Sequence, residues 1–157
     1  MKNKYIVSAC LLGKNCKYSG GNNLCPEIIK FLEDKEYYEI CPEVDGGLPT
    51  PRFPSEIING DAKEVILGNN KVINSNGDDV TKEFITGAEK AVSFAKVNNI
   101  THAILKSNSP SCGVKEVYDG SFSKKRVQGL GVSALMLKEE GIELIDSDDL
   151  ISKLRGD

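Results

Sequence analysis

The sequence predicts an α/β fold with a mainly parallel sheet, and three observations support this prediction. Short apolar, β-prone runs alternate with segments of helical periodicity along the whole chain. The first two runs, between Lys4 and Ile40, enclose a loop and a helix, as in a βαβ unit with parallel strands. The length of 157 residues suits one domain. We therefore expect residues 1–157 to form a single three-layer, Rossmann-like domain with a small β-hairpin insertion.

The first βαβ unit begins with the apolar run at residues 4–9, which predicts a buried strand ending at Cys10. A loop rich in Gly, Asn and Lys follows, and residues 25–35 then predict a short helix with a proline in its first turn. The run at residues 37–40 predicts a second strand, which ends at Cys41. Because the two strands are parallel, we expect both cysteines at the same edge of the sheet.

The segments that follow break this alternation. Residues 42–54 contain two glycines and four prolines, which predict neither helix nor central strand but a rigid loop across that edge of the sheet. Residues 62–75 predict a small peripheral hairpin, in which EVIL and KVIN are joined by a turn at residues 68–70.

The second half of the chain returns to alternating elements. Apolar residues at helical spacing over residues 80–97 predict the longest helix, and residues 101–107 predict a buried strand after it. A helix over 132–140, a strand over 142–145 and a closing helix over 147–154 complete the prediction. The strand over 101–107 runs directly into the motif SNSPSCG.

Composition excludes several classes of protein. The hydrophobic fraction of 39% and the charged fraction of 27% are typical of a globular protein. No apolar run approaches the roughly 20 residues that span a bilayer, and no secretion signal is recognisable, so we expect a cytoplasmic protein without a membrane segment. A net charge of -3 gives no general nucleic-acid signal, and the one basic stretch, residues 123–129, reads first as a solvated loop.

The cysteines carry the strongest chemical signal. Five cysteines are an odd number, which disfavours a disulfide framework in a reducing compartment and favours metal, cluster or catalytic use. Cys25, at the start of a helical pattern, reads as a small core hydrophobe. Cys10, Cys41 and Cys112 each follow a predicted strand, and ligands bind beyond the carboxyl ends of parallel strands. These three thiols are therefore expected to converge.

Two kinds of site fit converging thiols. A structural zinc ion takes four ligands, often in Cys-x-x-Cys pairs; no such pair is present, but Cys16 could serve as a fourth ligand. An iron-sulfur cluster suits thiolates from separate loops better. With only three cysteine ligands, one iron of a cubane would remain open to a sulfur-containing substrate.

Other side chains near the cysteines suit such chemistry. Glu43 is a candidate for activating water or moving a proton, or is a solvated loop carboxylate. Ser109 and Ser111 offer hydroxyls to a ligand or stabilise a turn, and Gly113 would let the backbone approach a bulky inorganic group. Arg52 would orient an anion or a carbonyl in the substrate pocket, or form a loop salt bridge.

Four motifs together resemble one known family. They are SACLLGKNCKYSGG, CPEVDGGLPTPRFPSEI, SNSPSCG and GLGVSALML, and they extend over most of the chain. They resemble the small bacterial and archaeal domain family, formerly of unknown function, that includes thiouracil desulfidase. The resemblance implies a redox-neutral desulfidase, in which a [4Fe-4S] cluster held by three cysteines binds the sulfur of a thiocarbonyl and water replaces that sulfur on carbon.

The resemblance also implies roles for individual residues. The implied cluster ligands are Cys10, Cys41 and Cys112. Glu43 would be the acid or base, and Ser109 would help to position the substrate. Cys16 would line the pocket or act as a reserve ligand.

The implied substrate is a small thiolated pyrimidine such as 2-thiouracil. Some relatives have a second, C-terminal domain, and some act on transfer RNA; because this chain ends at Asp157, we expect a free base or nucleoside, with RNA as a less favoured partner. Two alternatives from other classes are a non-catalytic zinc module and a nucleotide- or RNA-binding module that uses residues 123–131. The oligomeric state is not indicated by the sequence.

Overall fold

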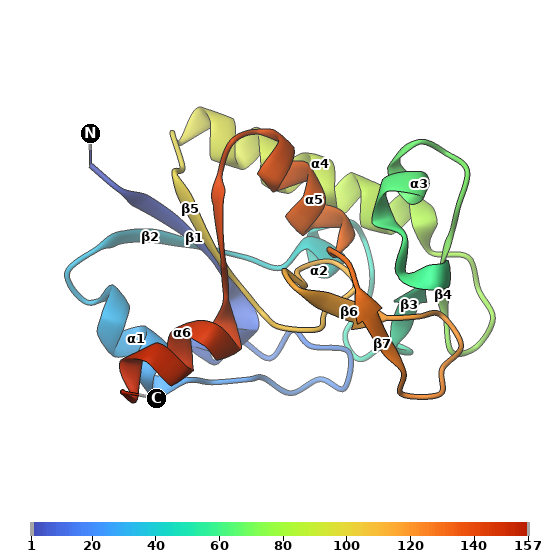
Figure 1. Ribbon diagram of the computed structural model, residues 1–157, viewed down its shortest axis with the longest axis horizontal. Coiled ribbons are helices and arrows are strands. Elements are labelled where there is room, and N and C mark those ends of the chain that lie inside the picture. The colour runs from blue at the N-terminus through green and yellow to red at the C-terminus, as the bar shows by residue number, and fades with distance from the viewer. Residues whose placement is uncertain (1, 157) are drawn as a thin grey trace.

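A four-stranded parallel sheet forms the centre of the computed structural model, which describes residues 2–156 (Figure 1). Its strands lie in the order β2 (Glu36–Ile40), β1 (Lys4–Ser8), β5 (His102–Leu105) and β8 (Glu143–Asp146). Every neighbouring pair is parallel, which confirms the predicted sheet. The chain leaves β1 toward β2 on one side and later returns to β5 on the other. The carboxyl end of β1 is thus a switch point, where such sheets bind ligands.

Helices cover both faces of the sheet. In Figure 1, α4 (Thr81–Val97) and α5 (Val132–Glu139) lie on one side of it, and α1 (Pro26–Leu32) and α6 (Ser147–Leu154) lie on the other. The three layers confirm the predicted α/β architecture.

Strand β1 shows why the chain adopts this arrangement, because its side chains alternate between two cores. Ile6 is buried with apolar residues of α4 and α5. Tyr5 and Val7 point to the opposite face and are buried with residues of α1 and α6. A strand that is apolar on both faces has to be covered by helices on both faces.

A one-turn helix, α2 (Pro42–Asp45), follows β2 and packs against α4 through two glycines. A Cβ on Gly46 would lie 1.9 Å from the carbonyl oxygen of Glu83, and one on Gly87 would lie 1.9 Å from that of Pro42. The two backbones are therefore in direct contact. The prediction that residues 42–54 contain no helix is wrong for the first four residues, because a proline is well tolerated in the first turn of a helix.

The hairpin predicted over residues 62–75 is also wrong in its detail. The EVIL stretch belongs instead to a helix, α3 (Ala62–Ile66), because the side chain of Asp61 accepts a hydrogen bond from the backbone N–H three residues on and so caps the helix. Only the second predicted strand exists, as β4 (Val72–Asn74). It pairs antiparallel with β3 (Ser55–Ile57), a strand that the sequence analysis placed in no element.

A second small hairpin was not predicted. It consists of β6 (Glu116–Tyr118) and β7 (Arg126–Gln128), joined by the β6–β7 loop, residues 119–125. The basic stretch read as a solvated loop therefore contains a strand. Two short 3-10 helices, η1 (Ala9–Leu12) and η2 (Ile58–Gly60), complete the structure, and η2 contacts both strands of this hairpin. Within residues 2–156, no helix has the length and apolar character needed to cross a membrane.

Candidate active site at the carboxyl edge of the sheet

A pocket of about 620 Å³ lies beyond the carboxyl ends of the parallel strands. It contains every residue that the sequence analysis singled out for a catalytic, ligand or substrate role. These residues are Cys10, Cys16, Cys41, Glu43, Arg52, Ser109, Ser111 and Cys112. The expected convergence of loops from separate strands is therefore present in the structure.

Three different strands deliver the thiols predicted as ligands. Cys10 lies in η1, directly after β1, and Cys41 lies between β2 and α2. Cys112 belongs to the loop after β5. Cys10 and Cys112 are buried and Cys41 is partly exposed. Cys25 is buried outside this pocket, in the core beneath α1, as expected of a small hydrophobe.

The thiol of Cys10 has a side-chain partner that the sequence analysis missed. Asn23 donates a hydrogen bond from Nδ2 to Cys10 Sγ at 3.3 Å, and its backbone N–H donates to the Cys10 carbonyl at 2.9 Å. Burial raises the pKa of the Cys10 thiol, and the bond from Asn23 opposes that effect. The Asn23 side chain thus orients the sulfur.

The four pocket thiols differ in acidity. The neighbouring Cys16 thiol lowers the pKa of Cys41 to about 7, assisted by the backbone N–H of Val44 and the charge of Arg52 and opposed by burial. When protonated, the Cys41 thiol donates to the Cys16 carbonyl at 3.7 Å. The Cys41 thiol in turn raises the pKa of Cys16 above its ordinary value. Complete burial raises the pKa of Cys112 to about 12. Near neutral pH, Cys41 is therefore the most readily ionised of these thiols.

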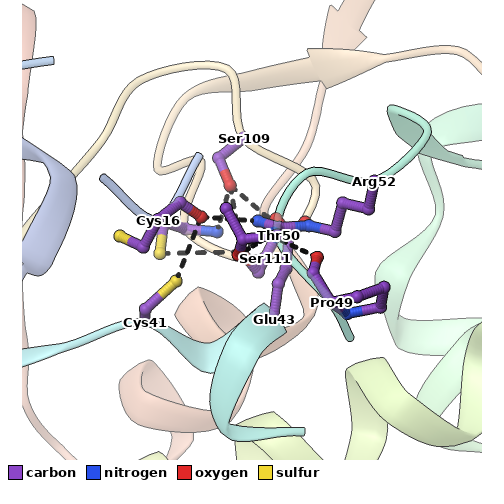
Figure 2. Close-up of polar contacts among 9 residues, drawn as sticks. Cys16, Cys41, Glu43, Pro49, Thr50, Arg52, Ser109 and Ser111 are labelled. Carbon is purple, nitrogen blue, oxygen red and sulfur yellow. Dashed lines mark hydrogen bonds and ion pairs between the residues drawn. The ribbon is translucent and has the colours of Figure 1, made fainter. Parts of the chain in front are cut away.

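The guanidinium of Arg52, a residue that lines the pocket, is held by hydrogen bonds to protein groups (Figure 2). Its Nε donates to Glu43 Oε1 at 3.2 Å and one terminal nitrogen donates to the carbonyl of Cys16 at 2.9 Å. The other terminal nitrogen donates at 3.1 Å to both the Pro49 carbonyl and Thr50 Oγ1. The side chains of Arg52 and Glu43 are only 6% and 13% exposed. Arg52 thus forms the salt bridge considered for it and also lines the pocket, and its contact with a substrate stays a prediction.

Two serines fix the other side of the Glu43 carboxylate (Figure 2). Ser111 donates from Oγ to Glu43 Oε2 at 2.9 Å, and its hydroxyl lies 3.0 Å from that of Ser109. The Ser109 hydroxyl in turn accepts hydrogen bonds from the backbone N–H groups of Ser111 and Cys112, at 3.2 and 3.0 Å. Ser109 thus stabilises the turn that carries Cys112, and its side chain still lines the pocket. Both oxygens of Glu43 are held by the protein.

The glycines of this region serve packing. Gly113 was expected to give clearance to an inorganic group, but it does not line the pocket. A Cβ there would lie 2.8 Å from the Ser109 carbonyl oxygen, so its own turn excludes a side chain. At Gly131, before α5, a Cβ would lie 2.4 Å from the Ser111 carbonyl carbon. The start of α5 therefore supports the serine turn from behind.

Several residues around the mouth of the pocket were not singled out from the sequence. They are Lys17, Tyr18, Asn23, Glu56, Lys106, Tyr118, Phe122 and Lys124. Lys124 stood in the basic run that was read first as a solvated loop, and Lys17, Tyr18 and Glu56 stood in two of the motifs that carry the family resemblance. No signal marked Asn23, Lys106, Tyr118 or Phe122, and the last two reach the pocket through the hairpin of β6 and β7.

The thiols do not form a site for a single metal ion. Within residues 2–156, no three His, Cys, Asp or Glu side chains are grouped closely enough to hold one. This geometry gives no support to a closed four-thiolate zinc site. A cluster makes a different demand, because each cysteine binds a different iron and the sulfurs need not meet at one point. Three soft thiolates around one pocket fit that demand.

Comparisons with known proteins agree with this chemistry. The family model described as 2-thiouracil desulfurase matches residues 5–149. An uncharacterized protein of Bacillus subtilis (strain 168), YbbK, is 41% identical over 145 residues, which are 92% of this chain and 96% of the relative. Among solved structures, the [4Fe-4S]-dependent thiouracil desulfidase TudS (DUF523Vcz) matches with a TM-score of 0.84 and 37% identity, over 96% of this chain and 95% of that one.

Proposed function

The chain belongs to the 2-thiouracil desulfurase family, as its motifs indicated, and from this premise we propose that it removes sulfur from a small thiolated pyrimidine such as 2-thiouracil. The reaction proposed is redox-neutral: water replaces the sulfur on carbon, and the sulfur leaves as hydrogen sulfide. The observation that carries the proposal is the pocket that three cysteines from separate strand ends line together with one fixed carboxylate.

We assign a [4Fe-4S] cluster to Cys10, Cys41 and Cys112. Support comes from the three thiols that line one pocket and from the [4Fe-4S]-dependent structural relative. When bound, such a cluster supplies an iron with an open position, which acts as a Lewis acid for soft sulfur. Cys16 lies beside Cys41, whose thiol is 3.7 Å from the Cys16 carbonyl, and is proposed as a pocket residue and not as a ligand.

Glu43 is the proposed base. Its carboxylate takes a proton from a water molecule, and the resulting hydroxide forms a bond to the carbon that carries the sulfur. The carbon–sulfur bond then breaks, and the protons that the water loses leave on the sulfur, so that a thiocarbonyl and water become a carbonyl and hydrogen sulfide. Arg52 and Ser111 hold the two carboxylate oxygens in place during this transfer. Ser109 contributes a hydroxyl to the wall of the substrate pocket.

Iron content and product formation after anaerobic reconstitution test this proposal. We expect a brown protein with about four irons per chain, as a cubane requires, and release of uracil and sulfide from 2-thiouracil. Serine in place of Cys10, Cys41 or Cys112 should abolish both iron retention and turnover. Cys25→Ser is the matched control, since Cys25 is buried but lies outside the pocket. A wild-type protein that takes up no iron and leaves 2-thiouracil intact would overturn the proposal.

A further inference from the structure

The β6–β7 loop brings an aromatic ring to the mouth of the pocket. Phe122 lines the pocket together with Lys124 of the same loop and Tyr118 at the end of β6. Phe122 is 38% exposed, so part of its ring is not covered by other groups of the protein. A partly uncovered ring at a pocket mouth is available to a ligand.

The backbone of this loop adopts an unfavourable conformation to place that ring. Phe122 has a φ angle of +55° and Lys124 one of +64°, both in the left-handed region that non-glycine residues seldom occupy. Two such residues in one short loop, both lining the pocket, are typical of segments whose conformation is held for a ligand. The surrounding structure has to supply the contacts that hold it.

Glu56 supplies those contacts. Its Oε1 accepts hydrogen bonds from the backbone N–H groups of Gly120 at 3.0 Å and of Phe122 at 3.2 Å. Gly120 packs so closely that a Cβ there would lie 2.8 Å from the Cα of Ile58. The loop is thus fastened to β3 and η2 by one carboxylate and one close backbone contact.

The hairpin is also joined to the turn that carries Cys112. A β-bridge links Asn108 to Val117 of β6. The hairpin that carries Phe122 and the loop that carries Cys112 are therefore joined through their backbones.

We propose that Phe122 packs its ring on the flat face of the pyrimidine and so selects planar substrates, and that Glu56 is the positioning residue that holds it there. This inference rests on the proposed function, which supplies the flat heterocycle. Aromatic side chains stack on any nucleobase, because every base presents a π face. Phe122 would then contribute to substrate affinity and not to the proton transfer at Glu43.

Steady-state kinetics with 2-thiouracil test the role of the ring. Phe122→Leu, which keeps apolar bulk but loses the planar face, should raise KM about tenfold with little change in kcat, the loss expected for one stacking contact. Phe122→Tyr keeps the ring and should keep the KM of the wild type. The control is Phe53→Leu, since Phe53 is also exposed, at 53%, but does not line the pocket.

The role of Glu56 is tested by a pair of variants. Glu56→Ala removes the acceptor for both backbone N–H groups and should raise KM in the same direction as Phe122→Leu. Glu56→Gln keeps an oxygen acceptor at the same place and should restore a KM near that of the wild type. Equal KM values for both variants and the wild type would show that this carboxylate does not position the ring.

A binding measurement gives an answer independent of turnover. The chain has no tryptophan, so Phe122→Trp introduces a single fluorescent reporter at the pocket. Titration of the reconstituted protein with uracil, the expected product, should change the emission of this variant in a saturable way, and should leave Phe53→Trp unchanged. An active wild type combined with unchanged KM in Phe122→Leu and identical titrations of the two tryptophan variants would overturn this inference alone. An inactive wild type would instead count against the proposed function.

Discussion

Replacement of Arg52 by methionine tests the arrangement that holds the proposed base. The guanidinium makes four hydrogen bonds to protein groups and is paired with Glu43 in a setting where the two side chains are 6% and 13% exposed. Methionine keeps much of the length and removes the charge and all donors. The Glu43 carboxylate then stays largely buried without its cation.

The expected loss of stability follows from this burial. Removal of one partner from a buried ion pair costs about 3–5 kcal/mol, and the residual exposure of the carboxylate favours the lower end, about 3 kcal/mol. For a chain of this length that corresponds to a decrease in Tm of about 6–12 °C. Thermal unfolding followed by circular dichroism, with urea unfolding at 25 °C as a second measurement, gives the values to compare.

Two further variants make the result decisive. Arg52→Met combined with Glu43→Gln removes the unpaired charge as well, so the double variant should be more stable than Arg52→Met alone. Arg126→Met is the control, because Arg126 and Glu116 are 47% and 45% exposed and 3.9 Å apart, a kind of pair worth about 1 kcal/mol or less. The reasoning is refuted if Arg52→Met loses no more than the control, or if the double variant is no more stable than the single one.

Three other results are expected. In the cluster-free protein, iodoacetamide should label Cys41 first, half-maximally near pH 7, because the pKa of its thiol is lowered. Cys112, whose thiol has a pKa of about 12, should stay unlabelled below pH 9. Labelling profiles measured by mass spectrometry that show no such order would contradict this ranking of the two thiols. Cys16→Ala should shift the labelling of Cys41 to higher pH, because the neighbouring thiol that lowers the Cys41 pKa is gone. It should leave iron content after reconstitution unchanged, and loss of iron would instead identify Cys16 as a ligand. Gly87→Ala should lower the midpoint of urea unfolding, because the new methyl group would lie 1.9 Å from the Pro42 carbonyl oxygen. This loss should exceed the gain of about 1 kcal/mol that alanine normally gives over glycine in a helix. An unchanged or higher midpoint would mean that α2 and α4 can move apart without loss of stability.

The sheet and the cysteine pocket were predictable because both depend on local patterns. Short apolar runs identify parallel strands, and the carboxyl ends of parallel strands share one edge whatever their order. Cys10, Cys41 and Cys112 therefore had to lie at the same edge once the strands were assigned. The convergence of these three cysteines followed from that geometry without knowledge of any contact.

The contacts themselves were not predictable, because they join segments far apart in the chain. Nothing local distinguishes an Arg52 that faces a ligand from one that binds Glu43 and the Cys16 carbonyl. The run EVIL contains two β-branched residues and predicts a strand, but the N-cap at Asp61 stabilises a helix there instead. Phe122 reached the pocket through a hairpin of three-residue strands, which are too short to give a periodic signal.

The direct contact between α2 and α4 has a consequence for how the pocket can change. A single helical turn is too short to be stable alone, so α2 takes its rigidity from the seventeen-residue α4 beneath it. Cys41 and Glu43 flank the start of that turn, and their spacing is therefore set by a helix that lies outside the pocket. Substitutions of residues that line the pocket can change substrate preference, but moving the Glu43 carboxylate relative to the Cys41 thiol would require a redesign of the glycine contact with α4. In directed evolution, substrate range should consequently vary far more easily than the geometry of the proposed proton transfer at Glu43.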